Sequence, residues 1–147
     1  MGARGYTFDA LLQLKDAGAI TSSAAAQVGG QAKILDMGAG RFDGTVVVNV
    51  SAIDIVSNDE EYNIIIQGSN SSSFASGIEN LAMLNLGATE VRDGGAQDSV
   101  PGQYEIGVTN EQADTVYRYI RAYTFIAGSS TTPSINYTAF LSNDAGR

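Results

Sequence analysis

Apolar and polar residues alternate with a period of two over most of the chain from residue 32 onward. The alternating segments are short, and loops rich in glycine, serine and asparagine separate them without helical patterns between. About seven or eight short strands spaced in this way are typical of an antiparallel β-sandwich. The sequence therefore predicts an all-β fold, either a jelly roll or an immunoglobulin-like sandwich, and the pattern alone does not choose between these topologies.

The clearest predicted strand covers residues 41–56, "RFDGTVVVNVSAIDIV". Its apolar positions share one face up to Val50 and change to the other face from Ile53. A change of phase within one strand indicates a β-bulge or a bend, here near Ser51 and Ala52. The residues expected on the first apolar face are Phe42, Val46, Val48 and Val50.

The strands that follow are separated by turn signals. Residues 57–60, "SNDE", predict a hairpin between residues 41–56 and the strand "EYNIIIQGS". The segment "NLAMLNLG" is expected to be a strand rather than a short helix, because Gly87 follows so soon. The residues predicted to face inward from "EYNIIIQGS", "QYEIGVT" and "SINYTAFLS" are Tyr62, Ile64, Ile66, Tyr104, Ile106, Val108, Ile135, Tyr137, Ala139 and Leu141.

The N-terminal region has a different pattern. Residues 8–17, "FDALLQLKDA", predict a short helix that Asp9 would cap and Gly18 would end. A helix of about ten residues is marginal alone, so it must dock or form part of an ordered arm. The predicted organisation is therefore an arm, short helix and connector over residues 1–30, followed by a β-sandwich domain over residues 31–147.

Residues 115–127, "TVYRYIRAYTFIA", predict one long strand that is apolar on both faces. One face resembles a core face, whereas the other is an aromatic stripe that contains an arginine. Because Tyr and Arg are enriched at protein–protein contacts, the candidate interface residues are Tyr117, Arg118, Tyr119, Arg121 and Tyr123. The alternative is that the aromatic stripe is the core, since large aromatic residues are usually buried. Both interpretations require a cover on each face of this strand.

Charge narrows the possible partners. The chain has 16 acidic and 8 basic residues, a formal net charge of −8, and no cluster of Lys or Arg. Such a surface repels phosphate backbones, so we expect no nucleic-acid partner. No apolar run has the length of a signal peptide or of a membrane span, and we expect no membrane partner. The absence of cysteine fits folding in a reducing cytoplasm.

The sequence offers few residues for catalysis. Without histidine or cysteine, Ser-His, Cys-His and histidine–metal sites are excluded. Lys15 and Lys33 have no signature serine beside them for a Ser-Lys dyad. The acidic residues Asp59, Glu60 and Glu61 crowd one turn, which we expect to be a solvated hairpin tip.

Ligand motifs are equally weak. The stretch "GAGRFDG" resembles a phosphate loop, but no helix N-terminus follows it to hold an anion. Asp93 and Asp98 miss the alternating spacing of a calcium loop. We therefore expect a protein that is not an enzyme and has no metal site and no cofactor.

Three long stretches carry a resemblance to a known family. They are "DALLQLKDAGAITSSAAA", "ILDMGAGRFDGTVVVNVSAIDIVSNDEEYNIIIQGS" and "YRYIRAYTFIAGSSTTPSINYTAFL". Together they resemble the jelly-roll capsid cement, or decoration, proteins of tailed bacteriophages, including that of a short-tailed Bordetella phage. The resemblance spans residues 9–141 and rests on phrases rather than on an invariant motif.

The resemblance implies a jelly roll that forms a homodimer or homotrimer and clamps neighbouring subunits of the major capsid protein on the capsid exterior. Such a protein would be made in the bacterial host cytoplasm, and the family has no catalytic residues to transfer. Two alternatives remain open. One is a head–tail joining or tail protein, and the other is a carbohydrate-binding sandwich whose tyrosines Tyr117, Tyr119 and Tyr123 stack on sugar rings.

Overall fold

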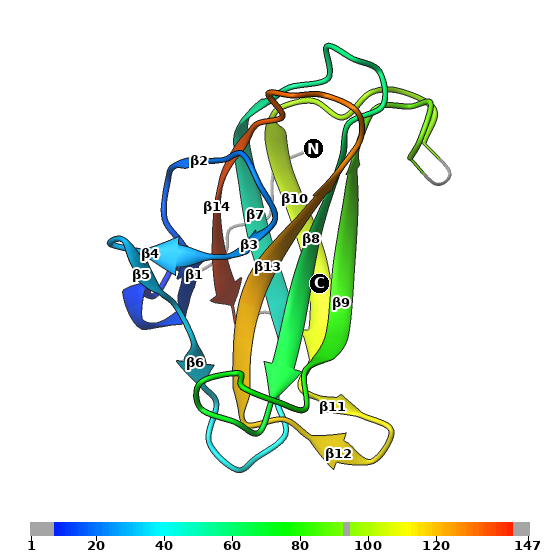
Figure 1. Cartoon of the computed structure of the whole chain (residues 1–147). Helices are drawn as coiled ribbons and strands as arrows, with labels where there is room; N and C mark the ends of the chain where they lie inside the picture. The colour runs from blue at the N-terminus through cyan, green and yellow to red at the C-terminus, as the bar shows by residue number, and fades with distance from the viewer. Residues whose placement is uncertain (1–7, 93–94, 143–147) are drawn as a thin grey trace, which may run out of the picture.

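The computed structural model describes residues 8–92 and 95–142 and contains two antiparallel sheets packed against each other (Figure 1). The front sheet in Figure 1, named the β13 sheet, has the order β3 (Ala24–Ala25), β13 (Tyr119–Ala127), β8 (Glu61–Ser69) and β9 (Glu79–Gly87). Its fifth strand, β6 (Leu35–Asp36), also pairs with β13.

The sheet behind it, named the β7 sheet, has the order β1 (Gln13–Lys15), β14 (Ile135–Ser142), β7 (Asp43–Ile53) and β10 (Gly102–Thr109), with β2 (Ala19–Ile20) also paired to β14. Two short ladders join β4 (Gln27–Val28) to β5 (Gln31–Ala32) and β11 (Glu111–Gln112) to β12 (Thr115–Val116). The predicted antiparallel β-sandwich is confirmed. The division into residues 1–30 and 31–147 stays a prediction, and the first seven residues of the predicted arm lie outside the described part.

The core lies between the sheets and contains the side chains that the period-two pattern placed inward. A single buried cluster includes Val46, Val48, Val50, Tyr62, Ile64, Ile66, Ile106, Val108, Ile135, Tyr137, Ala139 and Leu141. Phe42 and Tyr104 are half-buried and pack against this cluster. The predicted strand over "NLAMLNLG" is also confirmed, as β9.

The phase change in the longest strand is a β-bulge. Asn136 of β14 pairs with Ala52 of β7, and the next residue, Tyr137, pairs with Val50, so Ser51 is the extra residue. The Ser51 hydroxyl donates to the Asn136 carbonyl at 3.2 Å. The predicted bulge near Ser51 and Ala52 is therefore confirmed, because only an extra residue lets both halves of β7 keep apolar side chains inward.

The predicted hairpin at residues 57–60 is wrong. β7 pairs with β10 and β14, whereas β8 pairs with β13 and β9, so the chain crosses from one sheet to the other between β7 and β8. The turn is not a solvated tip either, because Glu60 is fully buried. Its carboxylate accepts the Ser57 N–H at 2.9 Å, and Asp59 accepts the Ser129 N–H at 2.8 Å. The acidic residues fix this crossing by accepting backbone donors.

The predicted helix over residues 8–17 is also wrong. Asp9 does accept the Leu11 N–H at 2.9 Å, but it caps only a 3₁₀ turn, Ala10–Leu12. The chain then enters β1, which pairs with β14 and places Leu14 in the core. Strand pairing gives this short segment hydrogen bonds and burial that an isolated helix of about ten residues lacks.

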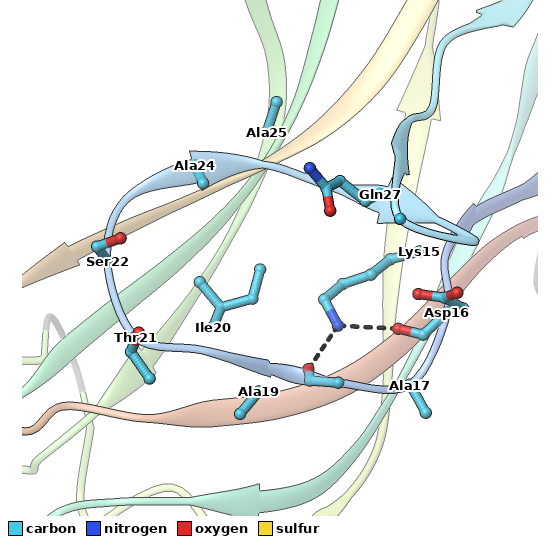
Figure 2. Close-up of a pocket in the computed structure, with 12 residues that line it drawn as sticks. Lys15, Asp16, Ala17, Ala19, Ile20, Thr21, Ser22, Ala24, Ala25 and Gln27 are labelled. Atoms are coloured by element: carbon cyan, nitrogen blue, oxygen red, sulfur yellow. Dashed lines mark hydrogen bonds between the residues drawn. The ribbon is translucent and has the colours of Figure 1, made fainter.

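Lys15 closes the loop that follows β1. Its ammonium donates to the carbonyls of Asp16, Gly18 and Tyr137 at 2.9, 2.8 and 2.7 Å, and it lies 4.6 Å from the centre of the Tyr137 ring. Figure 2 shows the first two of these bonds on one side of a cavity of about 440 Å³ that small side chains line. Burial lowers the pKa of Lys15. Three carbonyls use all three donors of the ammonium, which makes this lysine a structural clamp.

Tyr137 also joins the two sheets. Its hydroxyl forms a 2.6 Å hydrogen bond with the Thr124 hydroxyl of β13, and both side chains are fully buried. Burial raises the pKa of Tyr137 to about 12.

We expect Tyr137→Phe to lower the free energy of unfolding by about 1–3 kcal/mol, because it leaves the buried Thr124 hydroxyl without a partner. Urea unfolding followed by circular dichroism measures this change. The matched control is Tyr104→Phe, which removes the same atom from an exposed bond to the Val100 carbonyl and should cost less than about 0.5 kcal/mol. The double variant with Tyr137→Phe and Thr124→Val should lose less unfolding free energy than the sum of the two single variants. Equal losses of unfolding free energy in Tyr137→Phe and in the control would contradict this account.

Candidate protein-binding face on the β13 sheet

The long strand predicted over residues 115–127 is broken. β12 ends at Val116 and β13 begins at Tyr119, with Tyr117 and Arg118 between them. Asparagine side chains supply part of the backbone hydrogen bonding here, because Asn70 accepts the Arg118 N–H at 2.9 Å and Asn110 donates to the Tyr117 carbonyl at 3.0 Å. The Tyr117 N–H and the Arg118 carbonyl bond to the backbone of Asn110 and Met37. The sequence pattern continues through this break, so alternation alone did not reveal it.

The two faces of β13 are now distinguished. Ile120, Ala122 and Thr124 are buried and point into the sandwich. The aromatic stripe therefore lies on the outer face of the β13 sheet, which is turned toward the viewer in Figure 1. The alternative in which the aromatic stripe formed the core is wrong, since the smaller side chains fit between the sheets.

Strand register arranges this outer face in rows. Tyr123 of β13 pairs with Ile65 of β8, which pairs with Met83 of β9, and this row is apolar. The row on one side consists of Phe125, Asn63 and Asn85, and the row on the other side consists of Arg121, Gln67 and Asn80. Met83 is 58% exposed and Phe125 is 46% exposed. The result is an exposed apolar strip between two rows that contain amides.

Arg121 is the cation of this face. Its Nε donates to the Gln67 side-chain oxygen at 2.9 Å, and Gln67 in turn donates to Asn80 at 3.1 Å. The guanidinium lies 4.4 Å from the centre of the Phe74 ring and 5.7 Å from that of Tyr123. Burial lowers the pKa of Arg121. These contacts hold the guanidinium in one place over the sheet.

Phe74 belongs to the loop of residues 70–78, which crosses the lower end of β13 in Figure 1. Its side chain is only 5% exposed although it is not part of the core cluster, and its φ of 55° is in the left-handed region. This loop therefore covers part of the outer face. Phe74 was not predictable from the sequence, because a single phenylalanine in the polar stretch "SNSSSFASG" has no periodic pattern to mark it.

The other candidate residues have different positions. Tyr119 lies on the outer face with Arg121 and Tyr123, and the Arg118 guanidinium is 5.4 Å from the centre of its ring. Arg118 itself pairs with Asp36 through two bonds of 2.8 and 2.9 Å. Tyr117 instead lies against Gly68, where an added Cβ would come within 2.9 Å of the Tyr117 Cβ. The structure thus brings Tyr119, Arg121 and Tyr123 together and places Tyr117 elsewhere.

Comparison with known proteins adds no family. None of the protein-family models matches the chain, and a search of curated proteins also finds no match.

Within residues 8–92 and 95–142, no three acidic, histidine or cysteine residues gather as a metal site would require. Over the same ranges, no helix has the length and apolar character needed to cross a membrane. Asp93 lies outside the described residues, and Asp98 accepts the Thr89 N–H at 2.8 Å.

The ion pair at the edge of this face gives a pH prediction. The hydrogen bonds from Arg118, and then the N–H of Gly38, lower the pKa of Asp36 from 3.8 to about 2. Because the folded-state pKa is depressed, this pair stabilises the fold above the unfolded pKa of 3.8, and that contribution is lost as the pH falls through about 2. We expect Arg118→Gln to raise the pKa of Asp36 toward 3.8, although the Gly38 N–H keeps it somewhat lower.

Carboxyl-carbon NMR titration measures this pKa directly. Arg41→Gln is the matched control, because Arg41 pairs with Asp43 and Glu111 instead and its loss should leave Asp36 at about 2. A pKa of Asp36 that does not move in Arg118→Gln would show that the pair does not form in solution.

The loop of residues 70–78, which covers part of the outer face through Phe74, gives a stability prediction. Phe74→Ala should destabilise the protein by about 3 kcal/mol, at the low end for a buried phenylalanine because a surface loop can partly collapse. Hydrogen exchange should also speed up in residues 70–78 and around Arg121. The control Phe125→Ala removes an equal side chain from an exposed position and should change stability by less than about 1 kcal/mol. Equal effects of the two changes would show that Phe74 is not held against the sheet.

Proposed function

We propose that this protein is a structural virion protein, without enzymatic activity, that binds the outside of a tailed-phage capsid and stabilises it by clamping subunits of the major capsid protein. The observation that carries the proposal is the outer face of the β13 sheet. There an apolar strip of Tyr123, Ile65 and Met83 runs beside Phe125 and is not used by the core. Exposed apolar strips of this kind, bordered by polar residues, are typical of protein-binding surfaces.

The topology supports the same proposal. The long strands are, in chain order, β7, β8, β9, β10, β13 and β14. Each of them lies in the other sheet from the long strand before it, except that β8 and β9 share the β13 sheet. This alternation favours a jelly roll over an immunoglobulin-like order, in agreement with the family that the sequence resembles. The net charge of −8 favours the exterior of a shell over contact with packaged DNA.

The family resemblance also implies that the protein associates with itself as a dimer or a trimer, and we include this in the proposal. The carbohydrate-binding alternative loses support because its three tyrosines do not form one platform. Tyr117 lies against Gly68 rather than beside Tyr119 and Tyr123.

The test is co-sedimentation of the purified protein with capsid shells that lack it, followed by heating of the shells. We expect saturable binding at a fixed ratio to the capsid protein, and shells that survive a higher temperature when bound, because many modest contacts repeated by lattice symmetry act together. Hundreds of copies per particle would separate this role from a head–tail joining protein, which is present in about six or twelve copies. No binding to intact shells would rule the cement role out.

A further inference from the structure

Arg121 is held in place with most of its hydrogen-bonding capacity unused. A guanidinium has five N–H donors. Nε donates to Gln67, but within residues 8–92 and 95–142 the two terminal nitrogens have no hydrogen-bond partner. No carboxylate of these residues forms an ion pair with Arg121 either. A half-buried cation in this state gains more from a carboxylate than a fully hydrated cation would.

Three other cations among the described residues are already bound by carboxylates or carbonyls. Arg41 pairs with Asp43 and Glu111, Arg118 pairs with Asp36, and the Lys15 ammonium is bound by three backbone carbonyls. Arg92 donates to the Ser99 hydroxyl, whereas Arg121 lies beside the exposed apolar strip, bound to the Gln67 oxygen and close to the rings of Phe74 and Tyr123. The Gln67 oxygen and the Phe74 ring hold the guanidinium, and its two terminal nitrogens have the spacing to bind one carboxylate through two parallel hydrogen bonds.

The residues around Arg121 indicate what the partner surface must present besides a carboxylate. The next row of the sheet is Tyr123, Ile65 and Met83, with Phe125 beyond it. A small anion would leave this apolar strip exposed, whereas a folded protein surface would cover it. Large aromatic and arginine side chains surrounded by apolar area are the residues that contribute most at such contacts.

We propose that the outer face of the β13 sheet binds a protein surface that presents one carboxylate among apolar side chains, and that Arg121 receives this carboxylate. The inference rests on the proposed function, because it names the chemistry of the capsid surface that the protein clamps. The occupant is a different protein rather than a second copy, because a two-fold contact would place this face against itself, and its three rows contain no carboxylate that could receive Arg121.

The experiment compares Arg121→Gln, Arg121→Lys and Arg41→Gln with the wild-type protein in co-sedimentation with capsid shells that lack it. Arg121→Gln should weaken binding roughly ten- to a hundredfold, as expected for losing hydrogen bonds between charged groups. Arg121→Lys keeps the charge but cannot form two parallel bonds or stack in the same way, so it should also weaken binding severalfold. Arg41→Gln makes the same change in net charge just before β7 in the other sheet, and its affinity should stay within about twofold of wild type. Urea unfolding of each variant establishes that it is folded.

The outcomes separate the two proposals. Wild-type binding with an unchanged Arg121→Gln affinity would overturn the inference and leave the cement role standing. No wild-type binding would overturn the cement role and this inference with it. Sedimentation velocity of the protein alone tests the occupant, because a dimer that Arg121→Gln dissociates would show that the face binds a second copy instead.

Discussion

The sandwich depends on the burial of the apolar face of β7 against that of β8, two strands that follow each other directly in the chain. Neighbouring strands with a short connection usually pair side by side, but β7 pairs with β10 and β14 whereas β8 pairs with β13 and β9. The chain instead crosses between the sheets, and buried polar groups hold the crossing. Tyr62 donates to the Asp54 carbonyl at 2.8 Å and accepts the Ser134 N–H at 3.0 Å, while the Glu60 carbonyl accepts the Ala88 N–H at 2.9 Å.

Alternation along the chain was sufficient to predict β7, β8, β10 and β14 and the faces that they bury. It was also sufficient for the bulge at Ser51, because a change of phase is itself a pattern. Pairing partners were not predictable in this way, since a strand pattern states which side is apolar but not which strand lies beside it. The same pattern that suggested a hairpin at residues 57–60 is equally compatible with the crossing that the structure contains. The N-terminal segment was assigned to a helix because Leu11 and Leu12 fit helical spacing, yet Leu11 is 78% exposed and Leu14 enters the core.

The candidate face was predictable in part for the same reason. Odd-numbered aromatic residues from Tyr119 onward keep their alternation, so their shared face followed from the sequence. Tyr117 does not share this face, because it lies in the break between β12 and β13, where Asn110 and Asn70 bond to the backbone of Tyr117 and Arg118. Phe74 reaches Arg121 from a loop, and contacts of this kind depend on how a loop folds back rather than on any period within it. The half-covered arginine at the centre of the proposed contact is therefore a product of tertiary structure.

The position of Lys15 has a consequence for chemical labelling of this protein. The sequence contains two lysines, Lys15 and Lys33. An amine must lose a proton and expose a lone pair before it attacks an activated ester, and three carbonyls hold all the protons of Lys15 inside the fold. Lys33 lies between β5 and β6, at the β13 edge of the front sheet. Apart from the α-amino group, amine reagents should therefore attach a dye or a cross-linker to the folded protein at one defined side chain, next to the face that we expect the partner to cover.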